Sequence, residues 1–187
     1  YARRRDSDVG LSADLNLVGG LTVFHPEEIL TDQGGAYKVY SAYRNKWQRL
    51  SRQAAIDLNP ESVNFAATDI MESDDLAKKV ISPQGGEHQA IKVLNRFISS
   101  DGALLSYGKD RSRVDGNTTS GLSPYINFGM VSSELIVEKA SDLLSDQGLS
   151  GSESASVRTW LSELIWREFY QSTIYHFPDS IKKSLRP

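Results

Sequence analysis

The 187-residue chain contains no cysteine, which excludes disulfide frameworks, thiolate metal sites and cysteine nucleophiles. It has three histidines, His25, His88 and His176, and their wide separation matches no metal-ligand spacing. No hydrophobic run approaches the roughly 20 apolar residues of a membrane-spanning helix. We therefore expect a soluble, cytoplasmic protein with no resident metal and no membrane partner.

Positive charge is not in excess either. The 21 lysines and arginines face 24 acidic residues, so the net charge is −3 and no global field attracts nucleic acid. Any contact with DNA must therefore be local. The 39% of hydrophobic residues suffice for a core. Because the sequence starts at Tyr1 without a signal-peptide pattern, we expect it to begin inside a longer protein.

The spacing of apolar residues predicts mainly helical structure. Helices are expected over 41–53, over 87–100, from Ser132 or Ser133 to residue 144, and over 154–175. The last of these ends before Pro178, which disfavours helix at the residue that precedes it.

Other segments break the helical pattern. Leu21–Phe24 lies between a glycine pair and a His-Pro pair, so it predicts a short strand, and residues 36–40 also have a β-rich composition. Residues 57–86 contain two prolines, a glycine pair and few large apolar groups, which is typical of a linker. Residues 148–152 predict a flexible connection.

The last predicted helix carries a distinctive polar and aromatic face. Glu163, Trp166, Arg167 and Tyr170 follow the spacing i, i+3, i+4, i+7 and therefore share one side. A carboxylate, a guanidinium and two large rings could stack on a planar ring and hydrogen-bond its edge. An ordinary alternative stays open, in which Glu163 pairs with Arg167 and Trp166 packs on a neighbouring helix.

A second candidate is a loop rich in hydroxyl groups, Thr118–Pro124. Hydroxyls and free backbone N–H groups at a tight turn before a helix suit the oxygens of a phosphate. The same composition also describes an ordinary capped loop between helices. The loop matches neither the Walker pattern nor a complete G-x-G-x-x-G.

A third candidate is the segment 36–53, which interleaves aromatic residues with five basic residues and contains no acidic one. Such a segment could contact nucleic acid. It could equally be a solvated helix face whose arginine stems cover apolar surface.

Taken in order, these segments resemble the DNA photolyase and cryptochrome family, most closely a photolyase that acts on cyclobutane pyrimidine dimers. The resemblance spans nearly the whole chain. It is carried by the following residues: Tyr37-Lys38-Val39-Tyr40 with Trp47, Tyr107 twelve positions before Thr119, Thr119–Tyr125 with Phe128-Gly129, and Trp160–Tyr170 with Tyr175–Pro178.

The resemblance implies an internal fragment of a two-domain flavoprotein. Residues 1–35 would be the C-terminal end of an α/β, Rossmann-like antenna domain. Residues 36–86 would connect the domains, and residues 87–187 would form the first part of the helical FAD-binding domain. A second, antenna chromophore is possible, and its identity stays open.

Roles for individual residues also follow from the resemblance. Tyr107, Thr119, Ser120, Gly121, Leu122 and Ser123 would hold the phosphates and ribityl chain of FAD, and Trp160 and Arg167 would line its pocket. Glu163 and Trp166 would be the catalytic pair that receives the flipped-out pyrimidine dimer, with Arg167 also near the DNA substrate. A carboxyl group at Glu163 would hydrogen-bond the pyrimidine edge and stabilise developing charge, while Trp166 would stack on the bases.

The implied function is that of a deoxyribodipyrimidine photolyase, a monomeric carbon–carbon lyase. It would repair pyrimidine dimers in UV-damaged DNA by light-driven electron transfer from reduced FAD. One alternative is a cryptochrome, a blue-light receptor that binds the same flavin without repair, and another is a flavin-free interaction module. Glu163 and Trp166 favour repair, because a receptor has no need to grip a pyrimidine. The 187 residues alone are expected to bind flavin weakly and to be inactive, since only part of the pocket wall is present.

Overall fold

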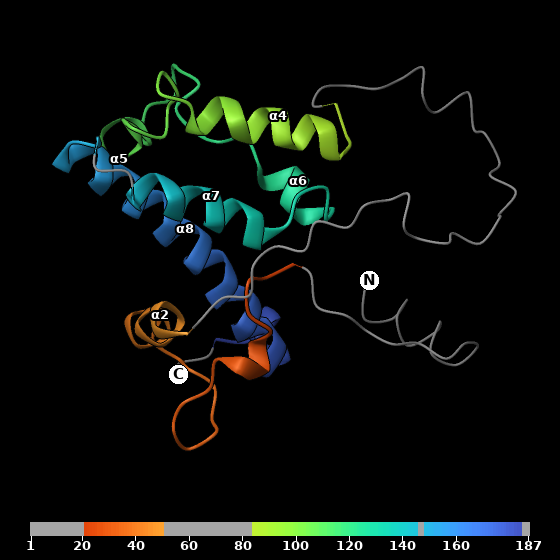
Figure 1. Ribbon diagram of the computed structural model, residues 1–187. Coiled ribbons are helices and arrows are strands. Elements are labelled where there is room, and N and C mark those ends of the chain that lie inside the picture. Colours follow the sequence, from red (N-terminus) through yellow and green to blue (C-terminus); the bar gives the residue numbers. More distant parts are fainter. Residues whose placement is uncertain (1–20, 51–83, 146–147, 185–187) are drawn as a thin grey trace, which may run out of the picture.

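A computed structural model describes residues 21–50, 84–145 and 148–184. Their architecture is helical, as Figure 1 shows, and within these ranges no strand forms beyond an isolated bridge between Leu30 and Ala36. The helices are η1 (Pro26–Glu28), α2 (Tyr40–Arg49), α4 (Glu87–Ile98), α5 (Tyr107–Asp110), α6 (Ser123–Asn127), α7 (Ser133–Ser145), α8 (Gly151–His176) and η3 (Pro178–Ile181). The prediction of a mainly α chain is confirmed.

Helix α8 is the 26-residue spine on which the other elements pack (Figure 1). Its N-terminal half shares one apolar core with α4, α5, α6 and α7, which contains Leu94, Ile136 and Val157 at 0% exposure. Its C-terminal half shares a second core with residues 21–50, built around Phe24, Tyr43, Trp47, Ile165 and Phe169. The two cores meet at Leu161 and Leu164, which pack against both.

Three predicted helices are confirmed with small shifts at their ends. The predicted helix 41–53 appears as α2, which begins at Tyr40; residues 51–53 lie outside the described ranges. The helix predicted over 87–100 ends at Ile98. Ser132 caps α7, because its Oγ accepts a hydrogen bond from the N–H of Leu135 at 3.1 Å.

The start of α8 was predicted three residues too late. The helix begins at Gly151, inside the range predicted as a flexible connection. Ser150 and Glu153 form a capping box, in which Ser150 Oγ accepts from the N–H of Glu153 and the Glu153 carboxylate accepts from the N–H of Ser150. This Ser-x-x-Glu pattern outweighs the poor helix propensity of the glycine and serines.

The strand predicted at Leu21–Phe24 is wrong, because this segment is bent and its polar backbone groups bond to helix side chains rather than to another strand. The carbonyl of Leu21 accepts from Ser133 Oγ at 3.1 Å and from Arg167 Nη1 at 2.6 Å. The N–H of Val23 donates to Glu168 Oε1 at 2.7 Å. Backbone polar groups that are partly withdrawn from water need partners, and here α7 and α8 supply them.

The predicted domain boundaries at 35/36 and 86/87 stay predictions. Residues 21–50 share their core with α7 and α8. The described part of the first predicted domain, residues 21–35, therefore packs against these helices. The predicted linker lies outside the described ranges except for residues 84–86. No helix in the described ranges combines the length and the apolar character needed to cross a bilayer.

Candidate functional site

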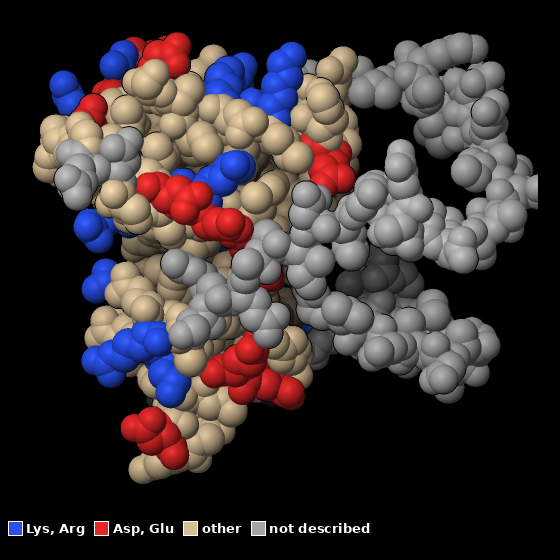
Figure 2. All heavy atoms as spheres, viewed as in Figure 1, with Lys and Arg blue, Asp and Glu red and all other residues tan. Residues whose placement is uncertain are grey.

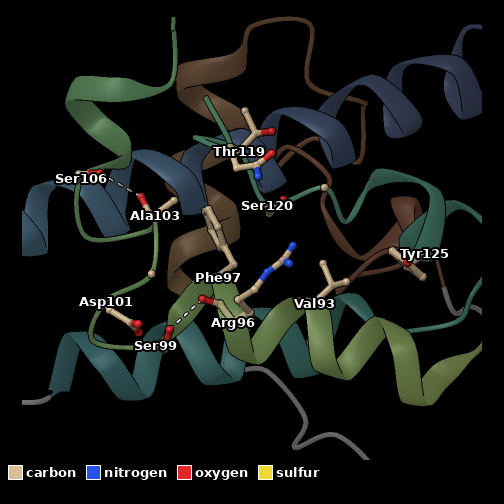
Figure 3. A pocket seen from close by; sticks show the side chains of 13 residues that line it. Val93, Arg96, Phe97, Ser99, Asp101, Ala103, Ser106, Thr119, Ser120 and Tyr125 are labelled. Atoms are coloured by element: carbon tan, nitrogen blue, oxygen red, sulfur yellow. Dashed lines mark hydrogen bonds between the residues drawn. The ribbon is translucent and has the colours of Figure 1, made fainter. Parts of the chain in front are cut away.

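A cavity of about 560 Å³ lies between the C-terminal end of α4 and the loop that leads into α6. Figure 3 shows its wall: Val93, Arg96 and Phe97 come from α4, and Thr119, Ser120 and Tyr125 face them from the other chain segment. Its polar lining residues are Arg96, Ser99, Asp101, Ser106, Asn117, Thr119 and Ser120. The cavity therefore offers mainly hydrogen-bond donors and hydroxyl groups, with one cation and one acid.

The turn after α4 shapes one wall of this cavity. Gly102 is required there, because a Cβ atom at this position would lie 2.3 Å from the carbonyl oxygen of Phe97. The close approach lets the N–H of Leu104 reach the same carbonyl at 3.2 Å. The chain thus reverses directly after α4 and carries Ala103 and Ser106 into the cavity lining.

The predicted phosphate loop lines the cavity through Thr119, Ser120 and Gly121. Gly121 has φ +66°, and a Cβ atom placed on it would meet no atom within 4 Å, so open space adjoins its backbone. The following helix α6 has five residues, so its dipole adds little to anion binding. Anion binding in this cavity would therefore depend on the hydrogen-bond donors of the loop rather than on the N-terminus of α6.

Three further residues predicted to hold the cofactor lie behind the cavity wall. Tyr107, Leu122 and Trp160 are 9%, 1% and 3% exposed and belong to the same core. The ring of Phe97, which lines the cavity, lies 5.1 Å from the ring of Trp160 and 6.2 Å from that of Tyr107. They support the wall. Ser123 is exposed at the start of α6 and is not part of the lining.

Glu163 is exposed on α8 and forms an ion pair that reaches another helix. Its Oε1 accepts from Arg111 Nη1 at 2.5 Å, and both side chains are more than 40% exposed (44% for Arg111 and 43% for Glu163). The ordinary alternative of a pair between Glu163 and Arg167 is therefore wrong for this residue, because Glu163 pairs instead with Arg111, just after α5. Burial raises the pKa of Tyr107, and the nearby Glu163 carboxylate raises it further while Arg111 opposes this.

Trp166 packs on a neighbouring helix, which confirms the ordinary alternative for this residue. Its ring lies 3.5 Å from that of Tyr40 with an interplanar angle of 8°. The Tyr40 hydroxyl is held in turn by Ser162, 3.0 Å from its carbonyl oxygen and 2.6 Å from its Oγ. Stacking on a flipped-out base stays a prediction, and it requires a ring face that Tyr40 does not cover.

Arg167 lies against the N-terminal segment rather than at the cavity. Its Nη1 donates to the carbonyl of Leu21 and to Gln171 Oε1 at 3.3 Å. Burial lowers its pKa from the ordinary value, with Glu168 opposing that effect. Of the four residues on the predicted face, Glu163 thus turns to Arg111 after α5, Trp166 to α2 and Arg167 to Leu21, while Tyr170 is 58% exposed.

Sequence reasoning missed Glu168, the most buried carboxyl group of the site region. It is 2% exposed, and its two oxygens accept from the N–H of Val23 and from Trp47 Nε1, each at 2.7 Å. Burial raises its pKa to about 7, against the opposing effect of these donors, the Phe24 N–H and Arg167. No sequence signal links positions 121 and 145 residues apart.

The basic and aromatic segment splits into a buried and an exposed side. Tyr43 and Trp47 are 1% and 3% exposed in the second core. Figure 2 shows basic side chains gathered over the end of the molecule where α2 lies. Lys38 Nζ lies 5.3 Å from the Phe177 ring and the Arg44 guanidinium 6.0 Å from the Tyr40 ring, so both cations cover aromatic surface. Arg52 lies outside the described ranges.

In the ranges that the structure describes, no group of three His, Asp or Glu side chains could hold a metal ion. No family model matches the chain. It is 30% identical, over 95% of its length, to a deoxyribodipyrimidine photo-lyase of a Synechococcus species. It is 31% identical, over its whole length, to a deoxyribodipyrimidine photo-lyase of Thermus thermophilus.

The chain spans 40% of the length of each of these relatives. A solved structure of a photolyase is also similar to the chain. It is a bacterial class III photolyase from Agrobacterium tumefaciens, which matches with a TM-score of 0.67 and 26% identity. This match covers 88% of the chain and 35% of that protein.

Proposed function

Because this chain belongs to the photolyase family, we propose that it forms part of a deoxyribodipyrimidine photolyase that binds FAD and repairs UV-damaged DNA. Both curated relatives described above carry that name, which favours repair over the signalling alternative. The chain spans 40% of the length of these relatives. We therefore propose, for the complete protein, that it binds flavin, acts on DNA and is a monomer.

One observation supports the flavin site most directly: the hydroxyl-rich loop and α4 enclose a single cavity of about 560 Å³. The residues present suit a dinucleotide, because hydroxyls, an amide side chain and a guanidinium can surround its phosphates, and Gly121 leaves room for them. Bound reduced FAD would supply the electron that light transfers to the lesion. The chain's own residues would bind and orient the cofactor.

Glu163 is the residue that we assign to the substrate. Its carboxylate is exposed and held by Arg111, so it stays accessible to a partner while its orientation is restricted. A carboxylate in this state can accept a hydrogen bond from the edge of a pyrimidine. Trp166 would add stacking on the bases, which would have to displace a ring that now stacks on it, Tyr40 at 3.5 Å or Tyr170 at 5.6 Å.

The test uses the natural gene product that carries this chain, with the substitution Glu163→Ala. We expect light-dependent loss of dimers from irradiated DNA to fall about tenfold per absorbed photon, because the hydrogen bond from the pyrimidine edge to a charged acceptor is lost, whereas flavin absorbance of the purified protein stays unchanged. Glu138→Ala on α7 is the matched control, because that carboxylate is also exposed and lies outside the cavity lining. An unchanged repair yield would remove Glu163 from the assignment, and a folded protein without flavin would refute the cofactor.

A further inference from the structure

The cavity contains one cationic side chain, and that cation has no counter-ion among the residues that the structure describes. Arg96 lies in the last turn of α4 and lines the cavity. Among the ion pairs of the described ranges, Arg111 pairs with Glu163 and Arg113 with two aspartates, but none involves Arg96. A guanidinium that lines a cavity and has no ion-pair partner within the described ranges is available to bind an anion.

The orientation of Arg96 agrees with this role. Figure 3 shows its guanidinium extending away from α4 into the cavity, on the side where Ser120 lies. Asp101 is the acidic residue of the lining, and Figure 3 shows it apart from the guanidinium, beside Ser99. The positive and negative groups therefore occupy different parts of the cavity.

The groups that face Arg96 suit a phosphate oxygen. Thr119 and Ser120 carry hydroxyls, and the backbone at Gly121 is unobstructed, since a Cβ atom there would meet nothing within 4 Å. A guanidinium presents a planar set of N–H donors that matches a phosphate bidentately. Arg167, the cation predicted from sequence to bind the cofactor, does not line this cavity.

We propose that Arg96 is the residue that pairs with the diphosphate of FAD, opposite the hydroxyl loop Thr119–Gly121. This rests on the proposed function for the identity of the ligand, but the anion site itself rests on the geometry of Arg96 and the loop. Arg96 acts as a binding residue and takes no part in electron transfer.

The experiment compares wild-type protein with Arg96→Gln, Arg96→Lys and the matched control Lys92→Gln. Lys92 is an exposed cation on the same helix, one turn earlier, and does not line the cavity. Affinities for FAD, ADP, inorganic pyrophosphate and riboflavin are measured by titration of the natural gene product that carries this chain, after its bound flavin has been removed.

Arg96→Gln should lower the affinities for FAD, ADP and pyrophosphate about tenfold. Riboflavin, which lacks the diphosphate, should bind equally to both proteins. Arg96→Lys should recover part of the loss, because lysine restores the charge without the planar donors. Added salt should weaken wild-type binding more than binding to Arg96→Gln.

Each outcome decides the proposal. Equal losses for Arg96→Gln and Lys92→Gln, an equal loss for riboflavin, or no binding of pyrophosphate and ADP would overturn it. If ADP and pyrophosphate depend on Arg96 while FAD does not bind the natural gene product, the anion site stands and the flavin function proposed above fails.

Discussion

The two halves of α8 hold their carboxylates in opposite ways. In the C-terminal half, Glu168 is buried and both of its oxygens accept N–H donors from residues 21–47. In the N-terminal half, Glu163 is exposed and bonds to one arginine, and α4, which shares a core with this half, carries Arg96, which forms no ion pair within the described residues. A polar group that is buried needs all its partners from the protein, whereas an exposed one can keep capacity for a ligand.

The difference separates a structural from a functional use of charge on one helix. Glu168 joins the N-terminal segment, α2 and α8, since its donors come from Val23, Phe24 and Trp47. Glu163 and Arg96 connect to few protein groups and lie where a ligand can reach them. Substitutions in the two halves should therefore affect different properties.

The largest effect is expected for Glu168→Ala. Val23, Phe24 and Trp47 would keep buried N–H donors without an acceptor, so the free energy of unfolding should fall by about 3 kcal/mol. Urea unfolding followed by tryptophan fluorescence measures this loss. Glu138→Ala, an exposed carboxylate on α7, should change stability by less than about 0.5 kcal/mol. Equal effects of the two substitutions would contradict a structural role for Glu168.

The second prediction concerns pH. Because burial raises the pKa of Glu168 from 4.5 to about 7, the folded chain binds more protons than the unfolded chain between these values. This contribution to stability is complete below pH 4.5 and is lost as the pH rises through about 7, by roughly 3 kcal/mol in total.

Unfolding free energies at a series of pH values test this, with Glu168→Gln as the comparison. Glutamine keeps one acceptor for the Val23 or Trp47 donor and does not titrate, so its stability curve should be flatter over this range. Parallel curves for the two proteins would contradict the assignment of the pH dependence to Glu168.

The smallest effect is expected for Arg111→Ala. The Arg111–Glu163 pair is exposed on both sides, so its loss should lower the free energy of unfolding by less than about 1 kcal/mol. The difference should shrink further in high salt, because exposed pairs are screened. Paired unfolding curves at low and high salt provide the measurement. A loss as large as that of Glu168→Ala would show that the carboxylate in the N-terminal half of α8 is also structural.

Local sequence patterns predicted most of the helices. The apolar spacing predicted α2, α4, α7 and the body of α8, because a helix face depends only on residues three and four apart. The Ser150-x-x-Glu153 capping box was equally local, and it gives the correct start of α8 once it is recognised. The failed strand at Leu21–Phe24 shows the limit: its composition suits a strand, but its backbone partners lie on α7 and α8.

The sequence by itself determined the helical class, the resemblance to a photolyase and the hydroxyl loop at Thr119–Gly121, since each depends on neighbouring residues or on their order. Only the tertiary structure decided which charges meet. Glu163 turns to Arg111 rather than Arg167, Glu168 accepts from donors in two distant segments, and Arg96 lines the same cavity as the loop. Such pairings depend on contacts between residues far apart in the chain, which form only when the cores around α8 are packed.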